Sequence, residues 1–342
     1  QVVWSTSSAA VVTVDAAGLA TAFNPGTATL TATLGAVSGS AGLTATAGAP
    51  QATEGPGGPL LVVTHPGNPY SRYLAEILRT EGFLAYSAMD VALVSPAVLA
   101  AHDVVLLGDF PLTASQAAMF DSWVATGGNL IAMRPDKQLA PTFGLTEISG
   151  ATLSNAYLQV ATASGPGAGI VGDTIQYKGT ADLYALNGAT VVATLYANAT
   201  TSASAPAVTL HASALGKAAA FTYDLARSVA QQRQGNPAWG GTTRTGVNPI
   251  RPVELFYGAS ATDPQPDWVD LNKVAIPQAD EQQRLLANLV LQMNLATRPL
   301  PRFWYLPSFH KAAVVMTGDD HNNQGTAARF NSYIPESTPG CS

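Results

Sequence analysis

A stretch rich in glycine and proline, Ala49-Pro-Gln-Ala-Thr-Glu-Gly-Pro-Gly-Gly58, divides this sequence into two parts with different patterns. Such a composition is typical of a linker. Before it, threonine alternates with alanine or leucine, a period of two that favours β-strands; after it, short apolar runs alternate with segments of helical period. The 342 residues therefore predict a multidomain protein, with a first domain at 1–49, a linker at 50–58 and an α/β domain at 59–297.

The first part reads as short strands joined by tight turns. Strand residues Thr27-Ala-Thr-Leu-Thr-Ala-Thr33 alternate as one buried face requires, and Asp15-Ala-Ala-Gly18 is a turn. Together with Trp4-Ser-Thr-Ser-Ser and Gly18-Leu-Ala-Thr-Ala, these residues resemble the second half of a bacterial Ig-like domain of group 2. The resemblance implies a partial β-sandwich that acts as a spacer. Its opening strands either lie further upstream or are supplied by another chain through strand addition.

The second part predicts an α/β domain. Strands are expected at Leu60–Thr64, Asp103–Leu107 and Asn129–Met133, and helices at Tyr70–Glu81 and from Thr113 to about Val124. This alternation indicates right-handed βαβ units and a flavodoxin-like parallel sheet. Residues from about 150 to 215 return to short strands, which predicts an antiparallel insertion or an extension of the sheet. A long helix is expected at 278–293, with one apolar stripe for core packing: Leu285, Leu286, Leu289, Val290 and Met293.

Several of these segments resemble a class I glutamine amidotransferase-like domain: Leu60–Thr64, Asp103–Pro111, Trp123–Ala132 and Ala218–Asp224. In active members a cysteine nucleophile stands at the tight turn after the strand that matches Leu130–Met133. This chain has Arg134-Pro135 there, and its only cysteine is Cys341. No thiolate precedes that position to attack an amide. We therefore interpret the domain as non-catalytic, as in related modules of sugar-active proteins.

The segment Asp224–Trp239 is the most polar stretch of this domain. Its amides, guanidinium groups and indole are the kinds of side chain that bind sugar hydroxyls and stack on sugar rings. One interpretation is a saccharide cleft; the other is a capped helix followed by a turn that packs on the next domain. The candidate substrate-binding residues are Arg227, Arg233, Gln234, Asn236 and Trp239.

The last apolar run ends in two adjacent carboxylates and an imidazole, Val315-Met-Thr-Gly-Asp-Asp-His321. Parallel α/β folds place their chemistry at the carboxyl ends of buried strands. Two neighbouring carboxylates repel each other unless a cation or a shared proton relieves the repulsion. The sequence therefore predicts a polar site at this strand end, with a metal ion or a shared proton between the two carboxylates.

The same run resembles the first motif of the polysaccharide deacetylases, usually Thr-Phe-Asp-Asp-Gly at the end of the first strand of a (β/α) barrel. The resemblance implies that Asp319 is the general base and that Asp320 binds a divalent metal, usually zinc. Gly318 and His321 depart from the pattern, and His321 is a further ligand, a substrate contact or a turn residue pointing to solvent. The family's later metal histidines have no counterpart before Ser342. We therefore expect residues 298–342 to be a connector and the inactive first strand and helix of a deacetylase domain.

The composition of the chain limits the classes of molecule that it can bind. A net charge of −6 without a cluster of lysine or arginine excludes a surface that tracks nucleic-acid phosphates. No run approaches the ~18 apolar residues that a membrane helix needs. Only 11% of the residues are charged, which is typical of a secreted or cell-surface bacterial protein. The expected partner is an extracellular polysaccharide.

Two functions remain open at this stage. The first is an enzyme: a secreted polysaccharide deacetylase, a carbohydrate esterase that hydrolyses acetyl groups on an extracellular glycan. The second is a structural or adhesive protein of a surface fibre or matrix, which assembles with itself through its incomplete terminal domains.

Overall fold

The computed structural model spans residues 1–342 and describes residues 2–22, 26–45, 54–241, 251–257, 267–303 and 328. Val315–His321, the predicted start of the deacetylase domain, lies outside these ranges. None of the helices described is long and apolar enough to cross a bilayer.

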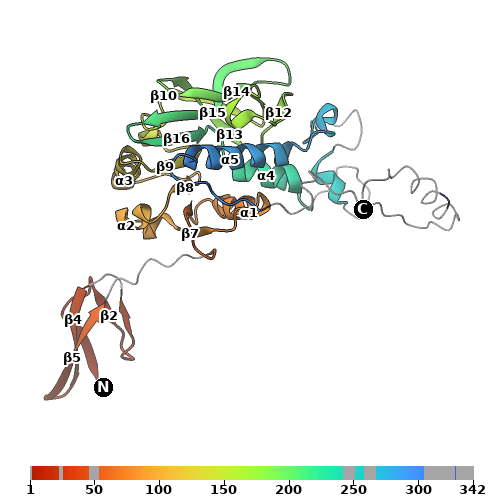
Figure 1. The fold of residues 1–342 in the computed structure, drawn as a ribbon. Helices are drawn as coiled ribbons and strands as arrows, with labels where there is room; N and C mark the ends of the chain where they lie inside the picture. The colour runs from red at the N-terminus through yellow and green to blue at the C-terminus, as the bar shows by residue number, and fades with distance from the viewer. Residues whose placement is uncertain are drawn as a thin grey trace. The chain divides into compact units, whose positions relative to one another are not determined.

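The N-terminal part consists of short antiparallel strands (Figure 1). One sheet contains β1 (Val3–Thr6), β4 (Gly26–Leu34) and β5 (Val37–Ala45), and a separate hairpin pairs β2 (Val12–Val14) with β3 (Ala20–Ala22). The predicted turn at Asp15 joins β2 to β3, because the Asp15 carboxylate accepts backbone hydrogen bonds from Ala17 and Leu19. Gly18, at φ +90°, lies so close to Trp4 that a Cβ would be 2.8 Å from the indole ring. Glycine is therefore required in this turn.

The α/β domain is built on a mixed nine-stranded sheet with the order β12-β11-β14-β15-β16-β9-β8-β6-β7. Five strands are parallel: β6 (Leu60–Thr64), β7 (Tyr86–Asp90), β8 (Val104–Leu107), β9 (Asn129–Met133) and β16 (Gly216–Phe221). Numbered among themselves along the chain, they have the order 2-1-3-4-5, which is the flavodoxin-like order. The predicted fold class is confirmed for this domain.

The remaining strands of the large sheet extend it in antiparallel fashion beyond β16. They are β11 (Tyr157–Val160), β12 (Ile175–Gln176), β14 (Thr190–Tyr196) and β15 (Ser202–Ser213). A separate two-stranded sheet pairs β10 (Leu145–Ser154) with β13 (Thr180–Leu186). Antiparallel neighbours need only short connections, which explains why this segment lacks the helical crossovers of the parallel part.

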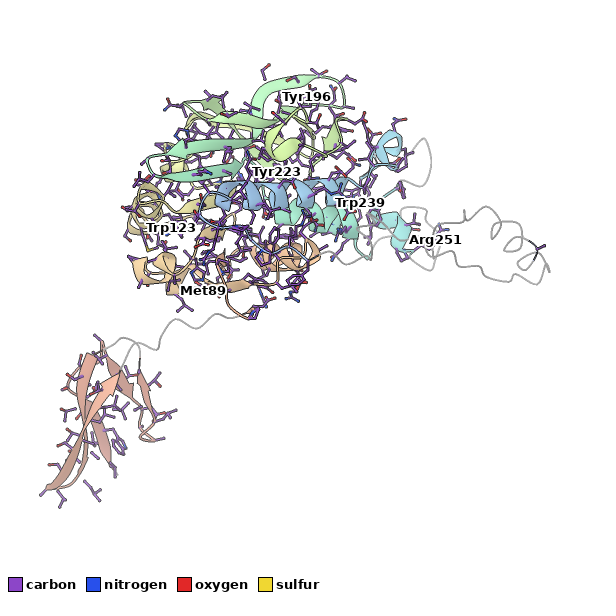
Figure 2. All side chains as sticks on the ribbon, in the orientation of Figure 1. Met89, Trp123, Tyr196, Tyr223, Trp239 and Arg251 are labelled. Atoms are coloured by element: carbon purple, nitrogen blue, oxygen red, sulfur yellow. The ribbon has the colours of Figure 1, made fainter. Side chains whose placement is uncertain are left out.

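Both faces of the parallel strands are buried, because alternate side chains enter two different cores. Leu60 and Val62 pack with α1 (Tyr73–Thr80), α4 (Leu225–Gln234) and α5 (Gln278–Asn294). Leu61 and Val63 pack with α2 (Pro96–Ala100) and α3 (Ala114–Ala125). Figure 1 shows α4 and α5 side by side on one face. Tyr223, which leads into α4, is fully buried in the middle of the domain (Figure 2).

The helix ends follow local sequence signals. Thr113 and Gln116 form a capping box at the start of α3, and Asp224 caps α4 by accepting from the Arg227 amide. The helix predicted at 70–81 begins instead with a 3-10 turn, Pro69–Arg72, capped by Asn68. The other 3-10 turns are Val91–Leu93, Lys137–Leu139, Gly165–Gly167, Pro237–Trp239, Pro252–Leu255 and Leu271–Lys273.

Helix α5 packs through the predicted apolar stripe, which is confirmed: Leu285, Leu286, Leu289, Val290 and Met293 are all at most 1% exposed. A buried amide adds specificity. Gln282 accepts hydrogen bonds from the Tyr223 and Ser228 hydroxyls and donates to the carbonyl of Gln176. The Gln282 amide therefore links α5 to both α4 and β12 through hydrogen bonds on its oxygen and its nitrogen.

The contact between β16 and the α3–β9 connection depends on Gly216. A Cβ at this residue would lie 2.2 Å from the Gly128 carbonyl oxygen and 2.3 Å from that of Val124. We predict that Gly216→Ala lowers the free energy of unfolding by about 1–3 kcal/mol, because the backbone must move apart. Urea denaturation followed by circular dichroism measures this change.

Gly172→Ala is the matched control. The atom nearest to a methyl group added at this residue would be Thr162 Oγ1 at 3.8 Å, an ordinary contact. We expect this variant to change stability by less than about 0.5 kcal/mol. Equal stability of the two variants would contradict the role given to Gly216.

Candidate functional site

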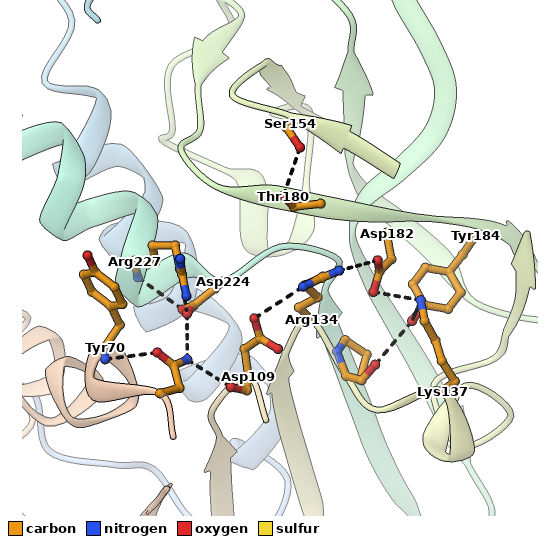
Figure 3. Close-up of polar contacts among 12 residues, drawn as sticks. Tyr70, Asp109, Arg134, Lys137, Ser154, Thr180, Asp182, Tyr184, Asp224 and Arg227 are labelled. Carbon is orange, nitrogen blue, oxygen red and sulfur yellow. Dashed lines mark hydrogen bonds and ion pairs between the residues drawn. The ribbon is translucent and has the colours of Figure 1, made fainter. Parts of the chain in front are cut away.

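Charged side chains gather where the parallel strands end. Asp109 follows β8, Arg134 follows β9 and Asp224 follows β16, so their loops open at the same edge of the sheet. Asp182 of β13 and Lys137 join them (Figure 3). We call Asp109, Arg134, Lys137, Asp182 and Asp224 the strand-end cluster. In flavodoxin-like sheets this edge, at the strands where the order reverses, is where ligands bind.

Arg134 occupies the turn at which the resemblance places a nucleophile. Its φ is +39°, an unusual value for a residue with a side chain. The turn is held by a 2.7 Å hydrogen bond from the Arg134 amide to the Phe221 carbonyl. The guanidinium donates to Asp182 at 2.9 Å, and its Nη1 lies 3.9 Å from Asp109 Oδ2. The side chain therefore bridges the loops after β8 and β9 to β13.

Lys137 holds the second oxygen of Asp182. Its ammonium is 2.7 Å from Asp182 Oδ2 and 3.1 Å from the Tyr184 hydroxyl, which in turn donates to the Pro135 carbonyl. Burial lowers the pKa of Lys137, but the hydrogen bonds to Asp182 and Tyr184 raise it more, so that it lies above its ordinary value. Lys137 is therefore a permanent cation here and not a base.

The other side of the cluster centres on Asp224, which is 3% exposed. Asn68, in the loop after β6, donates to Asp224 Oδ2 and to the Asp109 carbonyl, both at 2.9 Å. Arg227 Nε lies 3.7 Å from the same carboxylate, and its guanidinium lies 4.8 Å above the Tyr70 ring. Arg227 therefore compensates Asp224 while it packs on an aromatic face.

Asp109 has a raised pKa within the cluster. Burial, together with the nearby negative charge of Asp224, raises the pKa of Asp109 to about 6, although Arg134 acts in the opposite direction. Burial also raises the pKa of Asp224. A carboxyl group that titrates near pH 6 can donate or accept a proton under mild conditions. A shallow cavity of about 180 Å³ lies beside it, lined by Asp109, Phe110, Arg134, Lys137 and Asp182 among others.

The structure directs the residues of the predicted saccharide cleft to different neighbours. Arg227 joins Asp224 at the strand ends, whereas Arg233 pairs with Asp280 and donates to Gln283. Gln234 is the last residue of α4 and is exposed. The local structure is the capped helix and turn that the second interpretation describes. Their role in substrate binding stays a prediction.

Two of these residues serve the turn after α4. Asn236 caps the 3-10 turn Pro237–Trp239 by accepting from the Ala238 amide, and the Trp239 ring packs edge-on against Trp268 at 6.2 Å. In Figure 2, Trp239 lies at the end of the domain where α4 finishes.

The predicted catalytic and metal residues, Asp319, Asp320 and His321, lie outside the described residues. Within the ranges that are described, no three side chains of the His, Cys, Asp or Glu types come together to hold a metal ion.

Sequence reasoning missed most of the strand-end cluster. Asp319 was selected because a carboxylate follows a predicted buried strand. Asp109 also follows a buried strand, so the same signal would have identified Asp109. Asp182 and Lys137 carried none, because β13 reaches the cluster only through the tertiary fold.

Comparison with known proteins identifies the N-terminal part. Residues 1–45 match the family model of the bacterial Ig-like domain (group 2). They form a bacterial Ig-like domain. The resemblance seen in its turns and alternating strands is confirmed. Among curated proteins, none matches the chain.

Similar solved structures align with about half of the chain. A β-galactosidase from Bacillus circulans sp. alkalophilus is 10% identical over 52% of this chain and 31% of its own, with a TM-score of 0.40. An exo-β-1,4-mannosidase from Opitutaceae bacterium strain TAV5 is 16% identical over 52% and 33%, with a TM-score of 0.39. A cytoplasmic protein from Salmonella typhimurium is 15% identical over 56% and 82%, with a TM-score of 0.38. The chain thus spans about a third of the two glycosidases.

The raised pKa of Asp109 predicts a pH-dependent stability. The folded state keeps the proton up to about pH 6, whereas an unfolded aspartate loses it near pH 4, so the contribution of Asp109 to stability falls as pH rises between these values. We predict that Asp109→Asn stabilises the protein at pH 7 relative to wild type, by up to about 3 kcal/mol, and that this gain disappears near pH 4. Thermal denaturation at pH 4 and pH 7 measures both effects.

Asp173→Asn controls for the loss of a carboxylate. Asp173 has a 64% exposed side chain, and its only ion pair among the described residues joins it to Lys273. We expect a small change in Tm. A stability difference between Asp109→Asn and wild type that is the same at both pH values would contradict the burial of a titrating carboxyl at this position.

Proposed function

We propose that this protein belongs to a secreted, metal-dependent polysaccharide deacetylase of bacterial origin, which hydrolyses acetyl groups on an extracellular glycan. The proposal rests on the run Val315–His321, whose paired carboxylates follow an apolar segment in the manner of the first deacetylase motif. The bacterial Ig-like domain at residues 1–45 supports it, because such modules resemble the spacers of surface proteins. Residues 298–342 begin the catalytic domain in this proposal.

The geometry of the α/β domain supports a non-catalytic role beside that centre. The turn after β9 carries Arg134, and this side chain is engaged by Asp182 and lies near Asp109. A guanidinium does not lose its proton in proteins and therefore cannot act as a nucleophile or a base. This observation favours a module that positions or binds the glycan over a second hydrolytic site.

The proposed chemistry needs an activated water and a polarised acetyl carbonyl. A bound divalent ion, zinc in most relatives of this motif, supplies both functions. Asp320 would hold it together with ligands from the rest of the deacetylase domain, and His321 stands beside Asp320 as a candidate for a further ligand. Asp319 would accept the proton of the attacking water.

A structural role is the second candidate, favoured by the open edges of the sheet in the Ig-like domain. Among the described residues β5 pairs only with β4, and Val37 at its start is 74% exposed. An uncovered edge strand can add a strand from another chain. Light scattering over a hundredfold range of concentration separates the two: a constant monomer mass contradicts assembly through this edge.

We predict that the protein with its complete deacetylase domain releases acetate from acetylated glycans, and that a chelator abolishes the release. Asp319→Asn should lower kcat at least about 100-fold through loss of the general base. Asp320→Asn should lower metal affinity and activity together. Acetate release and metal content measure these effects.

The matched control is Asp173→Asn, which removes an exposed carboxylate from the α/β domain and should leave acetate release unchanged. Undiminished activity in both the Asp319→Asn and the Asp320→Asn variants would overturn the assignment of these roles. Activity that persists after chelation would overturn the metal.

A further inference from the structure

A cavity of about 380 Å³ lies between the C-terminal half of α4, the first turn of α5 and the segments around Phe256 and Val274. It is separate from the strand-end cluster, since none of the residues in its lining belongs to that cluster. Its volume is within the range of small-ligand sites. The polar side chains at its wall are Gln176, Lys178, Gln232, Arg233, Gln278 and Asp280.

Lys178 places a buried positive charge in this wall. The residue is 2% exposed, and its ammonium donates to the Trp268 carbonyl and lies 4.3 Å from the centre of the Trp268 ring. No carboxylate of the described residues lies within ion-pair distance of it. Taking a charge out of water without a counter-ion is costly. The ammonium also has donors left over, because it has three and its only hydrogen bond to a described residue uses one.

Gln232 contributes a hydrogen-bond acceptor that has no donor among the described residues. Its amide nitrogen donates to the Gln176 carbonyl at 2.5 Å, which fixes the orientation of the side chain. Its Oε1 is buried and accepts no hydrogen bond from any residue described. A buried acceptor without a donor is rare in folded proteins and points to a missing partner.

The first turn of α5 adds a further preference for negative charge. No side chain caps this helix of 17 residues, which starts after Pro277, and Ala279 and Asp280 of its first turn line the cavity. The first amides of a helix favour an anion, and Asp280 and Glu281 of this turn already supply part of that negative charge. The carboxylate of Asp280 is itself engaged by Arg233.

The remaining walls are apolar and partly aromatic. Phe256 and Tyr257 are half-buried, and Val274, Ile276 and Pro277 complete this side. Inorganic phosphate would leave these apolar walls without a partner. A ligand that pairs with Lys178, donates to Gln232 and packs on the apolar side chains carries a carboxylate, a hydroxyl donor and a compact ring with apolar faces.

We propose that this cavity binds the carboxylate-bearing unit of an acidic saccharide, a hexuronic acid. The carboxylate accepts from Lys178, a ring hydroxyl donates to Gln232 Oε1, and a ring face packs on Phe256 and Tyr257. A neutral sugar brings no negative charge to the lysine and binds more weakly. The inference concerns the α/β domain alone and stands or falls independently of acetate release.

Wild-type protein provides a test that needs no substitution. Burial lowers the pKa of Lys178 to about 8, while the negative charge of Asp270 acts in the opposite direction. The other ionisable groups around the cavity are Arg233, Asp280 and Tyr257. Because Lys178 loses its charge above pH 8, we expect glucuronate to bind about tenfold more weakly at pH 9 than at pH 7. Glucose binding should not follow this profile.

Calorimetric titration of the full chain with D-glucuronate, D-glucose and inorganic phosphate measures the specificity. We expect glucuronate to bind at least tenfold more tightly than glucose, and Lys178→Met to lose this difference. Methionine keeps the length and volume of the buried side chain, and a thermal melt checks that the variant folds.

Lys217→Met is the matched control. The Lys217 ammonium also donates a hydrogen bond to a backbone carbonyl, that of Met293, but Lys217 does not line the cavity. It should bind glucuronate as wild type does. Three results would each overturn the proposal: equal affinity for glucose and glucuronate, an unchanged affinity in Lys178→Met, or binding of phosphate without glucuronate.

Discussion

The burial of both faces of the parallel strands governs the structure of the α/β domain. Leu61, Val62 and Val63 are each inaccessible to solvent, although neighbours along the strand point in opposite directions. Helices must therefore cover the sheet on both sides, and no polar chemistry fits on either face. Buried charge lies instead at the strand ends and in the gaps between helices, as Asp224 and Lys178 show. The strand-end cluster and the cavity between α4 and α5 occupy these two kinds of place.

Charge compensation then shapes the strand ends. Three carboxylates, Asp109, Asp182 and Asp224, stand among three cations, Arg134, Lys137 and Arg227. Asp182 has two cationic partners within 3 Å, whereas Asp109 has one at 3.9 Å. Burial and the nearby negative charge of Asp224 raise the pKa of Asp109, and the distant guanidinium of Arg134 offsets only part of this effect.

The fold of this domain was readable from the sequence because its signals are local. The apolar runs at Leu60 and Asn129, the capping pair of Thr113 and Gln116, and the stripe on α5 each act within one element. The candidate sites were not readable in this way. Asp182 meets Arg134 across 48 positions, and Lys178 meets Trp268 across 90. Such pairings follow from tertiary packing, which no short pattern encodes. The polar stretch after Asp224 shows the same limit: its side chains look alike in sequence, but the helix and turn direct Arg227 and Arg233 to different neighbours.

The compensated cluster also limits how this protein can evolve. Asp224 and Asp182 are almost fully buried, so a mutation that removes one nearby cation leaves a carboxylate without enough compensation. A thiol at position 134 would remove the guanidinium that Asp109 and Asp182 share. Hydrolysis at this turn would thus require several coordinated replacements, because single changes in the cluster leave buried charge without compensation.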